Sequence, residues 1–402
     1  MSTPSPIGYL VPEFPSQTHA FFWREMQAME AAGVPVHLFS TRSPPPEACP
    51  HDFADTARAR TTYLFPPNPL QTAMMLIKRP ARTLQAISYI LGLSETPLPQ
   101  RLRLLGLVPT AAGLAQTART RGMSHIHIHS CANAAHLGAL AHILDGLDYS
   151  LTLHGDLPVY GTDHSAKMKR ACFVSAVTAP LQRALQQEIG HDQPYPVIWM
   201  GVDVERFCPN PARNIDLEAP FKVVTIARLN YMKGHRFFLR AMAQLRSEGL
   251  HIHYQIAGDG PERAKIEAEI ATLGLEDQVD MLGSISETRV LELLRSANAL
   301  ALTSINQGEA APVAVMEAMS CGLPCIVSII GGTQDMINDG VDGLLAPQRD
   351  VETITTALRK LVLDPEARVA MGQAARTSAE AKFDHRRNAV ALYEAISGSK
   401  AP

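Results

Sequence analysis

The sequence predicts an α/β protein made of two domains, each built on a parallel sheet. The chain has 402 residues, too many for one compact core, and about 200 residues per domain is the natural division. Short apolar segments with strand character alternate with amphipathic helical segments, a pattern typical of parallel strands joined by crossover helices. Apolar residues make up 46% of the chain, which is enough to build two cores.

The first half of the chain supplies several strands and a long helix. We expect strands at residues 7–11, 36–40, 125–129 and 149–153. Between the first two strands, Phe21, Phe22 and Met26 recur at helical spacing, and Gly33 is placed to cap the C-terminus of this helix. Residues 43–69 are rich in proline, and we expect them to be irregular.

A linker and a second series of strands follow. Residues 196–200 have strand character, and residues 208–220 combine prolines with a lack of periodicity, which is typical of a linker. Beyond the linker we expect strands at residues 222–226, 253–257, 279–282, 299–303 and 325–328, and helices at 236–245, 313–320 and 387–396. The sequence therefore predicts a first domain at 1–205, a second at 206–383 and a terminal segment at 384–402.

Composition excludes several classes of protein. The formal net charge is −3 and charged residues make up 19%, so we expect no nucleic-acid partner. Six scattered cysteines without a Cys-x-x-Cys pattern are typical of reduced thiols in a reducing compartment. The N-terminal residues do not have the pattern of a secretory signal, and no apolar run approaches a membrane span. We expect a cytoplasmic protein, either free or peripheral at the inner face of the cell membrane.

Residues 68–121 carry a local excess of positive charge. A single acid, Glu95, stands against seven cations: Lys78, Arg79, Arg82, Arg101, Arg103, Arg119 and Arg121. Leu84, Ile87 and Leu91 fall on one helical stripe in the same segment. Two interpretations stay open: a surface that docks on anionic lipid, or an ordinary surface whose apolar residues face the core.

Two acids near the helix at 313–320 are candidate ligands for a nucleotide sugar. Pro312 stands near the start of this helix, and the free N–H groups of a helix N-terminus form a natural site for a diphosphate. Glu317 lies inside the helix, where it can accept hydrogen bonds from ribose hydroxyls. Glu309 lies in the preceding loop and could bind hydroxyls of a transferred sugar. By themselves, two glutamates at this spacing often occur by chance.

Two cations in the loop after residues 222–226 strengthen the interpretation. Arg228 and Lys233 suit the negative charge that builds on a departing nucleotide diphosphate, although a solvated basic loop is the simpler alternative. Glycine turns at residues 258–261 and 331–335 also follow strands. The order and spacing of these elements together, rather than any one of them, indicate a donor site.

This set of motifs resembles family 4 glycosyltransferases, which have the GT-B fold. The matching segments are residues 226–234, 257–261, 282–283, 309–319, 322–324, 331–332 and 339–345. In the first half, the His-Gly-Asp run that begins at His154 looks like the family's His-Gly element near the acceptor. Residues 12–16, with Phe21 and Glu25, and the alternating histidines at 125–129 are similar to exopolysaccharide-type members such as those making colanic acid.

The resemblance implies two Rossmann-like domains facing a cleft, with the donor held mainly by the second domain and the C-terminal helix crossing back onto the first. It implies catalytic roles for His154, Glu309, Arg228 and Lys233. It places the donor at Arg228, Lys233, Gly258, Gly283, Ser284, Glu309, Ala310, Ala311, Pro312, Val313 and Glu317, with the base near residues 283–286. It places the acceptor side at Glu13, Ser16, Gln17, Thr18, His129 and Asp156.

The sequence departs from the family pattern at three places. The usual Gly-aromatic-Pro after Glu309 is Ala-Ala-Pro at residues 310–312, which predicts a differently shaped sugar pocket. Asp335 stands where glutamate is commoner, and residues 13–18 replace the Gly-Gly pair of the first loop.

The alternating histidines also suggest a metal site. His125, His127 and His129 share one face of a strand, and Cys131 or His136 could complete a ligand set. We do not favour this site, because three side chains on one strand run parallel and cannot enclose an ion.

The resemblance and the site together predict a retaining glycosyltransferase. It would move a hexose-type sugar from a UDP- or GDP-linked donor to a saccharide or lipid-linked hydroxyl, in exopolysaccharide or cell-surface glycan synthesis. No Asp-x-Asp occurs in the donor half, so we expect neither a metal nor another cofactor. The alternatives are an epimerase or phosphorylase of the same fold, or a non-catalytic protein that binds sugar nucleotides.

Overall fold

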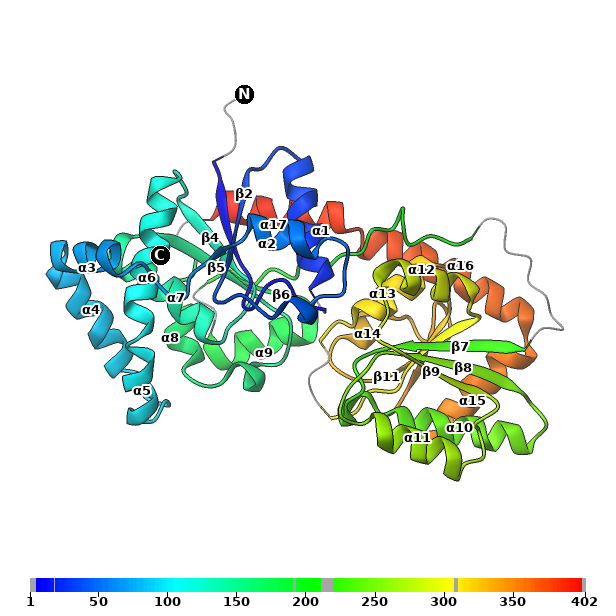
Figure 1. Ribbon diagram of the computed structural model, residues 1–402. Helices are drawn as coiled ribbons and strands as arrows, with labels where there is room; N and C mark the ends of the chain where they lie inside the picture. Colours follow the sequence, from blue (N-terminus) through cyan, green and yellow to red (C-terminus); the bar gives the residue numbers. More distant parts are fainter. Residues whose placement is uncertain (1–4, 18, 191–192, 211–219, 307–309, 400–402) are drawn as a thin grey trace. The chain divides into compact units, whose positions relative to one another are not determined.

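The chain folds into two α/β units. The computed structural model describes residues 5–17, 19–190, 193–210, 220–306 and 310–399. One unit comprises Met1–Trp199 and Arg386–Pro402, and the other comprises Met200–His385 (Figure 1).

The first unit is built on a six-stranded parallel sheet. Its strands are β1 (Ile7–Leu10), β2 (Val36–Ser40), β3 (Thr62–Tyr63), β4 (His125–Ile128), β5 (Asp148–Leu153) and β6 (Val174–Ala176). They lie in the order β3-β2-β1-β4-β5-β6. Its helices are α1 (Ala20–Ala31), η1 (Pro46–Ala48), α2 (Ala54–Arg60), α3 (Pro69–Lys78), α4 (Pro80–Leu91), α5 (Leu98–Leu104), α6 (Leu107–Thr120), α7 (Asn133–Asp145), η2 (Leu157–Tyr160), α8 (His164–Met168), α9 (Ala179–Ile189) and α17 (His385–Gly398).

The second unit repeats this architecture. Its strands are β7 (Phe221–Ile226), β8 (Ile252–Ala257), β9 (Val279–Gly283), β10 (Ala299–Leu302), β11 (Cys325–Ser328) and β12 (Leu344–Ala346). They are parallel and lie in the order β12-β11-β10-β7-β8-β9. Its helices are η3 (Tyr231–Lys233), α10 (His235–Ser247), α11 (Arg263–Thr272), α12 (Glu287–Ser296), α13 (Val313–Ser320), α14 (Thr333–Met336), α15 (Val351–Leu363) and α16 (Pro365–Lys382).

Each sheet has one point where the strand order reverses. In the first sheet it lies between β1 and β4, and in the second between β7 and β10. The predicted α/β class with two parallel sheets is therefore confirmed. Ligands of open parallel sheets bind beside such reversal points, at the carboxyl ends of the strands.

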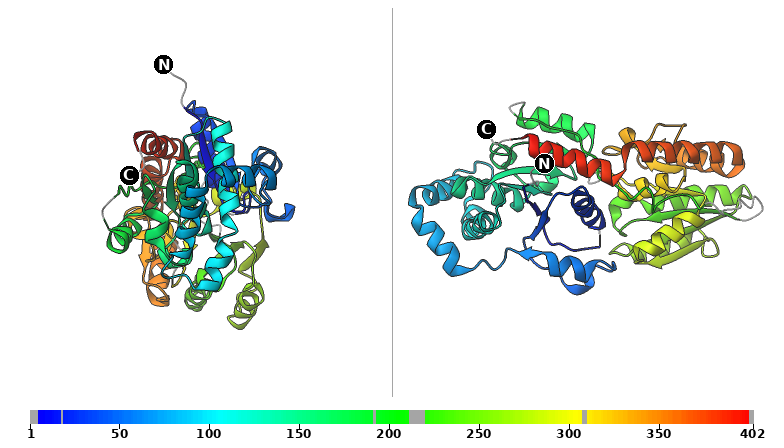
Figure 2. Two further views of the ribbon diagram at one scale, coloured as in Figure 1. Left: turned by 90° about the vertical axis from the view of Figure 1, so that its left-hand side faces the viewer. Right: turned by 90° about the horizontal axis from the view of Figure 1, so that it is seen from above.

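Helices cover both faces of the sheets (Figure 2). On one face of the first sheet, Tyr9 and Met26 share a core cluster with Leu392 and Ile396, so α1 and α17 pack there. On the other face, α7 approaches closely because residue 138 is glycine. A Cβ on Gly138 would lie 2.6 Å from the Ile128 side chain.

Two sequence expectations were wrong. Residues 43–69 are not irregular throughout, because they contain η1, α2 and the edge strand β3. Ala57 of α2 is fully buried in the core of this unit, so tertiary packing stabilises a short helix that the proline-rich sequence did not predict. Residues 196–200 form no strand; an isolated bridge between Val197 and Ala176 is the only β pairing that the structure describes there.

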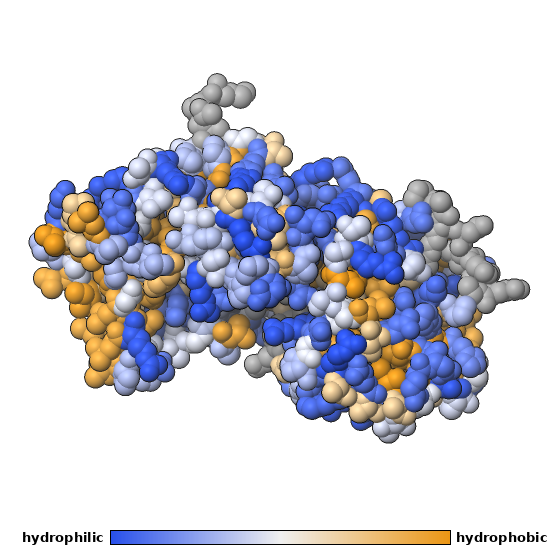
Figure 3. Space-filling model, in the orientation of Figure 1, coloured by the Kyte–Doolittle hydropathy of each residue, from blue (hydrophilic) through white to orange (hydrophobic). Residues whose placement is uncertain are grey.

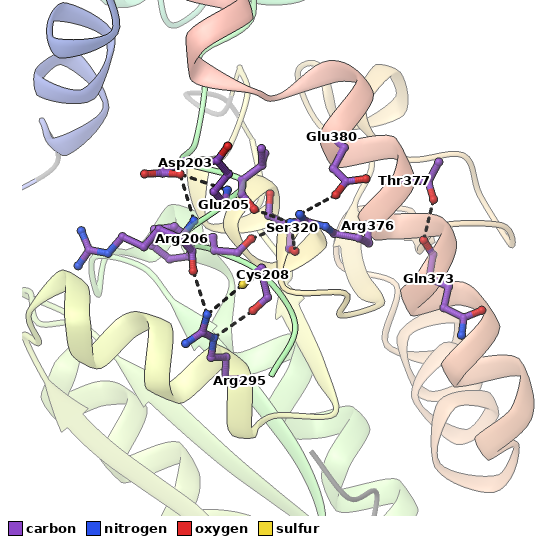
Figure 4. Close-up of polar contacts among 12 residues, drawn as sticks. Asp203, Glu205, Arg206, Cys208, Arg295, Ser320, Gln373, Arg376, Thr377 and Glu380 are labelled. Carbon is purple, nitrogen blue, oxygen red and sulfur yellow. Dashed lines mark hydrogen bonds and ion pairs between the residues drawn. The ribbon is translucent and has the colours of Figure 1, made fainter. Parts of the chain in front are cut away.

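Arg376 of α16 fastens α13 to the segment that enters the second unit (Figure 4). Its Nη1 donates to the main-chain oxygens of Val204, Phe207 and Ser320 over 2.7, 2.9 and 2.7 Å. Arg295 holds the same segment by donating to the main-chain oxygen of Cys208 over 3.0 Å. These charge-assisted bonds satisfy carbonyl groups that no regular element would pair.

Candidate functional site

The donor-site candidates of the second unit gather along one edge of its sheet. Arg228 follows β7, Gly258 follows β8 and Gly283 ends β9, while Pro312 and Val313 begin the helix after β10. Because all these strands are parallel, their carboxyl ends share this edge. The loops after β7 and β10 flank the point of strand reversal.

Hydrogen bonds tie those two loops together. The Thr303 hydroxyl donates to the main-chain oxygen of Gly234 over 3.1 Å, and the Ile305 N–H donates to the main-chain oxygen of Met232 over 2.7 Å. Gly234 has φ 62°, and a Cβ on it would lie 2.0 Å from the Thr303 oxygen. Lys233, next to this glycine, is therefore held beside the chain that leads to α13.

A second glycine brings the β8 loop to the same edge. Gly258 has φ 147°, and a Cβ there would lie 1.9 Å from the main-chain oxygen of Ala227. Its N–H donates to the main-chain oxygen of Gly283 over 2.7 Å. The Gly258 backbone thus packs against the residue before Arg228, and Ser284 is exposed just beyond.

The helix α13 starts at this edge with small, buried residues before it. Ala310 and Ala311 are 4% exposed, and Pro312 is the N-cap residue, with no side-chain capping bond. Among the described residues, the capping residue therefore leaves the first N–H groups of the helix open to an anionic ligand. Glu317 lies one turn along α13 and is 7% exposed. Glu309 lies outside the described residues, as does Thr18 of the acceptor-side set.

In the first unit, the structure brings His129 and His154 together. His129 follows β4 and His154 follows β5, and His129 Nδ1 lies 3.1 Å from His154 Nε2. Phe21 and Phe22 of α1 pack against the His154 ring at centroid distances of 5.3 and 5.1 Å. His154 is partly exposed at the carboxyl edge of the sheet.

Two further buried residues, Tyr9 and Glu25, lie next to these histidines. Neither of them was assigned a role from the sequence. The Tyr9 hydroxyl donates to Glu25 Oε1 over 2.6 Å, and the same oxygen lies 3.3 Å from His129 Nε2. A signal for Glu25 was present, because it is an acid on the apolar stripe of α1 between Phe22 and Met26. Tyr9 gave no such signal, since a tyrosine in a buried strand is ordinary.

Burial controls the protonation of this cluster. It raises the pKa of Glu25 to about 7, and the hydrogen bond from Tyr9 opposes the rise. Burial lowers the pKa of His154 to about 3, with a smaller contribution from His19. Burial also holds the pKa of His129 well below its usual range. Both imidazoles are therefore neutral at pH 7.

The two other histidines of β4 are satisfied by hydroxyls of β5. His125 Nε2 and His127 Nδ1 both lie 2.7 Å from Ser150 Oγ, and His127 Nε2 lies 2.8 Å from Thr152 Oγ1. Across the described ranges, no group of three His, Cys, Asp or Glu residues is arranged to hold a metal ion.

The remaining acceptor-side candidates lie in loops after β1 and β5. Glu13 is exposed and pairs with Arg42, whose Nε donates to Glu13 Oε1 over 2.7 Å. The Gln17 N–H donates to the main-chain oxygen of Ala48 over 2.7 Å. Ser16 is partly buried in the same loop, and Asp156 precedes η2. These residues share the carboxyl edge of the first sheet with His129 and His154.

Comparison with known sequences finds a family model that matches the second half of the chain. Residues 211–378 match the family described as "Glycosyl transferases group 1". The matched stretch contains Arg228, Lys233 and Glu317. The predicted resemblance to family 4 glycosyltransferases of the exopolysaccharide type is confirmed.

Two curated relatives act in exopolysaccharide synthesis by their descriptions. The chain is 28% identical over 225 residues to the protein assigned as the colanic acid biosynthesis glycosyltransferase WcaL of Escherichia coli (strain K12), covering 55% of this chain and 54% of WcaL. It is 31% identical over 189 residues to the amylovoran biosynthesis glycosyltransferase AmsK of Erwinia amylovora, covering 46% of each. The chain thus aligns with about half the length of these relatives.

Solved structures share the fold over nearly the whole chain. Alr3699/HepE of Anabaena, in complex with UDP and glucose, matches with a TM-score of 0.74 and 18% identity over 98% of this chain and 99% of that one. The sucrose-phosphate synthase of Thermosynechococcus elongatus matches with a TM-score of 0.74 and 20% identity over 98% of each. The predicted GT-B fold, with its two Rossmann-like domains, is confirmed.

Proposed function

We propose that this protein is a retaining glycosyltransferase that moves a hexose-type sugar from a nucleotide diphosphate donor to a saccharide or lipid-linked hydroxyl. Its place would be exopolysaccharide or cell-surface glycan synthesis. The match of residues 211–378 to the group 1 family model and the similarity to exopolysaccharide relatives support this class of activity.

One observation carries the proposal. The loop with Arg228 and Lys233 is hydrogen-bonded to the segment that leads to the N-terminus of α13. The bonds from Thr303 to Gly234 and from Ile305 to Met232 hold the loop of Arg228 and Lys233 against the chain leading to α13. Fixed cations and helix N–H groups stabilise a diphosphate as its charge grows. This half of the site fits the leaving group of a nucleotide-sugar donor.

The proposed roles follow from that placement. Arg228, Lys233 and the N-terminus of α13 hold the diphosphate, and Glu317 accepts hydrogen bonds from the ribose. The bond between the anomeric carbon and the phosphate oxygen breaks while the acceptor oxygen attacks from the same face, and the acceptor proton passes to the leaving phosphate. The configuration is thereby retained, and neither a metal nor another cofactor is required in this scheme.

The nucleotides used or bound by similar proteins support UDP or GDP as the nucleotide of the donor. Alr3699/HepE is described in complex with UDP and with UDP-glucose. A relative from Mycolicibacterium smegmatis, 28% identical over 211 residues, is described as a GDP-mannose-dependent mannosyltransferase.

A thermal-shift screen with UDP, GDP and their sugars tests the proposal. A nucleotide at about 100 times its Kd should stabilise the protein by about 2.7 kcal/mol, and Lys233→Ala should reduce this shift. Lys265→Ala is the matched control, because Lys265 is an exposed cation that pairs with Glu262 on its own helix turn. An equal shift in all three proteins would refute the assignment of Lys233.

We also propose that residues 68–121 dock this protein on an anionic membrane surface. The structure describes outward apolar side chains on three consecutive helices: Leu70, Met74 and Ile77 on α3, Leu84 and Leu91 on α4, and Leu98 and Leu102 on α5. Figure 3 shows an apolar patch over these helices. Leu84 is 67% and Ile77 78% exposed, so the alternative of a core-facing stripe is wrong for Leu84.

Charge favours lipid as the partner of this patch. Lys78, Arg82 and Arg103 are exposed on the same three helices, whereas Arg79 and Arg119 pair with Asp145. Apolar side chains flanked by cations are the pattern of helices that lie in the interface of anionic bilayers. A membrane-spanning helix is absent from the part of the chain that the structure describes.

Vesicle flotation tests this surface. The protein should float with vesicles containing phosphatidylglycerol and not with pure phosphatidylcholine, and Ile77→Asp with Leu84→Asp should abolish flotation. Leu363→Asp is the control, because Leu363 is 61% exposed but lies on α15 of the other unit. Flotation of the double variant at the wild-type level would rule out this surface.

A further inference from the structure

Four polar side chains from four separate segments lie in a row that ends at His154. Tyr9 of β1 donates to Glu25 Oε1 of α1 over 2.6 Å. The same oxygen lies 3.3 Å from His129 Nε2, within ion-pair distance, although that nitrogen makes no hydrogen bond to the described residues. His129 Nδ1 lies 3.1 Å from His154 Nε2. We call Tyr9, Glu25, His129 and His154 the relay.

Aromatic packing encloses the relay. The Phe22 ring lies 4.8 Å from the His129 ring and 5.1 Å from the His154 ring, measured between centroids. Tyr9 is 0% and His129 4% exposed, and the Tyr9 and His129 rings lie 4.3 Å apart. In a buried, apolar environment it is costly for two N–H donors to face each other. The nitrogen that carries the proton on one ring therefore restricts which nitrogen carries it on the neighbouring ring.

We infer that Glu25 is a positioning residue for His154: acting through His129, it holds the His154 ring in place and decides which of its nitrogens carries the proton. The inference rests on the proposed function and adds to it that Glu25 controls which tautomer of His154 is present in the site. The relay itself is observed independently of any activity.

The proton positions follow from which atoms face each other. When Glu25 is ionised, its negative charge 3.3 Å from His129 Nε2 favours a proton on that nitrogen, so His129 Nδ1 has the lone pair and accepts from His154 Nε2–H. The lone pair of His154 is then on Nδ1. When Glu25 is protonated on Oε1, its hydroxyl favours a lone pair on His129 Nε2. His129 Nδ1–H then donates to His154 Nε2, and the His154 proton lies on Nδ1. The two states differ by one proton from solvent.

The surroundings allow this exchange near neutral pH. Burial raises the pKa of Glu25 to about 7 and holds the pKa values of His129 and His154 low enough that both rings stay neutral. The other titratable groups that act on the relay are His127 on β4 and His19 before α1. Burial lowers the pKa of His19 to about 4 and that of His127 well below its usual range, so neither adds a charge.

Nitrogen-15 NMR of the histidine rings in the full chain tests the inference without requiring activity. The spectra would be recorded from about pH 5.5 to about pH 8.5, with signals assigned by their loss in His154→Gln and His129→Gln. In the wild type, His154 should change from the Nδ1–H to the Nε2–H tautomer near pH 7. Glu25→Gln should abolish this change, because an amide does not titrate.

Two more variants complete the test. Tyr9→Phe removes a hydrogen bond that lowers the pKa of Glu25, so the midpoint of the change should move to higher pH. Ser150→Ala is the matched control, because its buried hydroxyl bonds His125 and His127 but not the relay, and it should leave the midpoint unchanged. A His154 tautomer that is constant in the wild type, or that changes equally in Glu25→Gln, would overturn the inference.

Kinetics then separate this inference from the proposed function. If the protein transfers sugar, Glu25→Gln should lower kcat by up to about 100-fold at unchanged donor KM and remove the step near pH 7 from the kcat profile. Absence of any transfer, with the NMR change intact, would refute the proposed function and leave the relay established.

Discussion

The Thr303 hydroxyl donates a hydrogen bond to the main-chain oxygen of Gly234 over 3.1 Å, joining the loops on either side of the strand reversal in the second sheet. The contact is possible only because residue 234 has no Cβ and adopts φ 62°. The predictions for the donor site begin from this relationship.

Gly234→Ala should destabilise the protein by about 2–4 kcal/mol, from left-handed backbone strain and the clash with the Thr303 oxygen. It should also weaken nucleotide binding by displacing Lys233. Urea unfolding and calorimetric titration measure the two effects. Gly249→Ala is the control, since Gly249 has φ 83° with nothing within 4 Å of its Cβ position. It should show the backbone strain alone, and equal losses in both variants would contradict the role of the contact.

The two acids around α13 should have different effects on ligands. Glu317→Ala should weaken binding of UDP or GDP itself, because it removes a charge-assisted bond to the ribose. Glu309→Ala should spare the bare nucleotide and weaken the nucleotide sugar. Titration calorimetry with each ligand distinguishes them. Loss of bare-nucleotide binding in Glu309→Ala would mean that the two roles are wrongly assigned.

Arg376→Met should destabilise the second unit by about 2–4 kcal/mol, because three main-chain oxygens lose their charged donor. One of them ends α13, so nucleotide affinity should fall as well. Arg359→Met removes an exposed pair with Glu248 and should cost less than about 1 kcal/mol. Denaturant titration of both variants provides the comparison, and similar small costs would show that Arg376 is not an anchor.

Mild acid should destabilise the first unit through its buried histidines. Burial lowers the pKa of His19, His125 and His136 to about 4, so the unfolded chain binds more protons below pH 6.5. Each such histidine contributes stability that is lost at up to about 1.4 kcal/mol per pH unit as pH falls from 6.5 toward 4.

Glu25 acts in the opposite direction. Its raised pKa favours the folded state at low pH, a contribution lost as pH rises from about 4.5 to about 7. Several histidines outweigh one acid, so the free energy of unfolding should fall between pH 6.5 and 4. Urea midpoints at intervals across this range measure it, and a flat profile would contradict the buried neutral state of these rings.

Transfer should retain the anomeric configuration and proceed with a chelator present. In the proposed site, Arg228, Lys233 and the N-terminus of α13 would supply the positive charge that a metal would otherwise provide. Product NMR compares the new linkage with the donor's anomer. An inverted product, or activity abolished by EDTA and restored by Mg²⁺ or Mn²⁺, would refute this.

The sequence by itself determined the class of this protein and the placement of most strands and helices in the second unit. Alternation of apolar strands with amphipathic helices is a local property, and α13 and β11 have the predicted bounds, residues 313–320 and 325–328. The donor-site candidates could be named for the same reason, because each lies just after a strand and parallel strands end at one edge.

Only the tertiary structure decided which side chains meet. Tyr9 is ordinary by sequence, and Glu25 is noticeable only as an acid on the apolar stripe of α1. They approach His129 and His154 only because β1, α1, β4 and β5 converge. Likewise, the spacing of Leu84 could not show whether it faces core or solvent, since periodicity defines a face but not what covers it. Contacts between distant segments depend on how elements pack, and no local pattern encodes that.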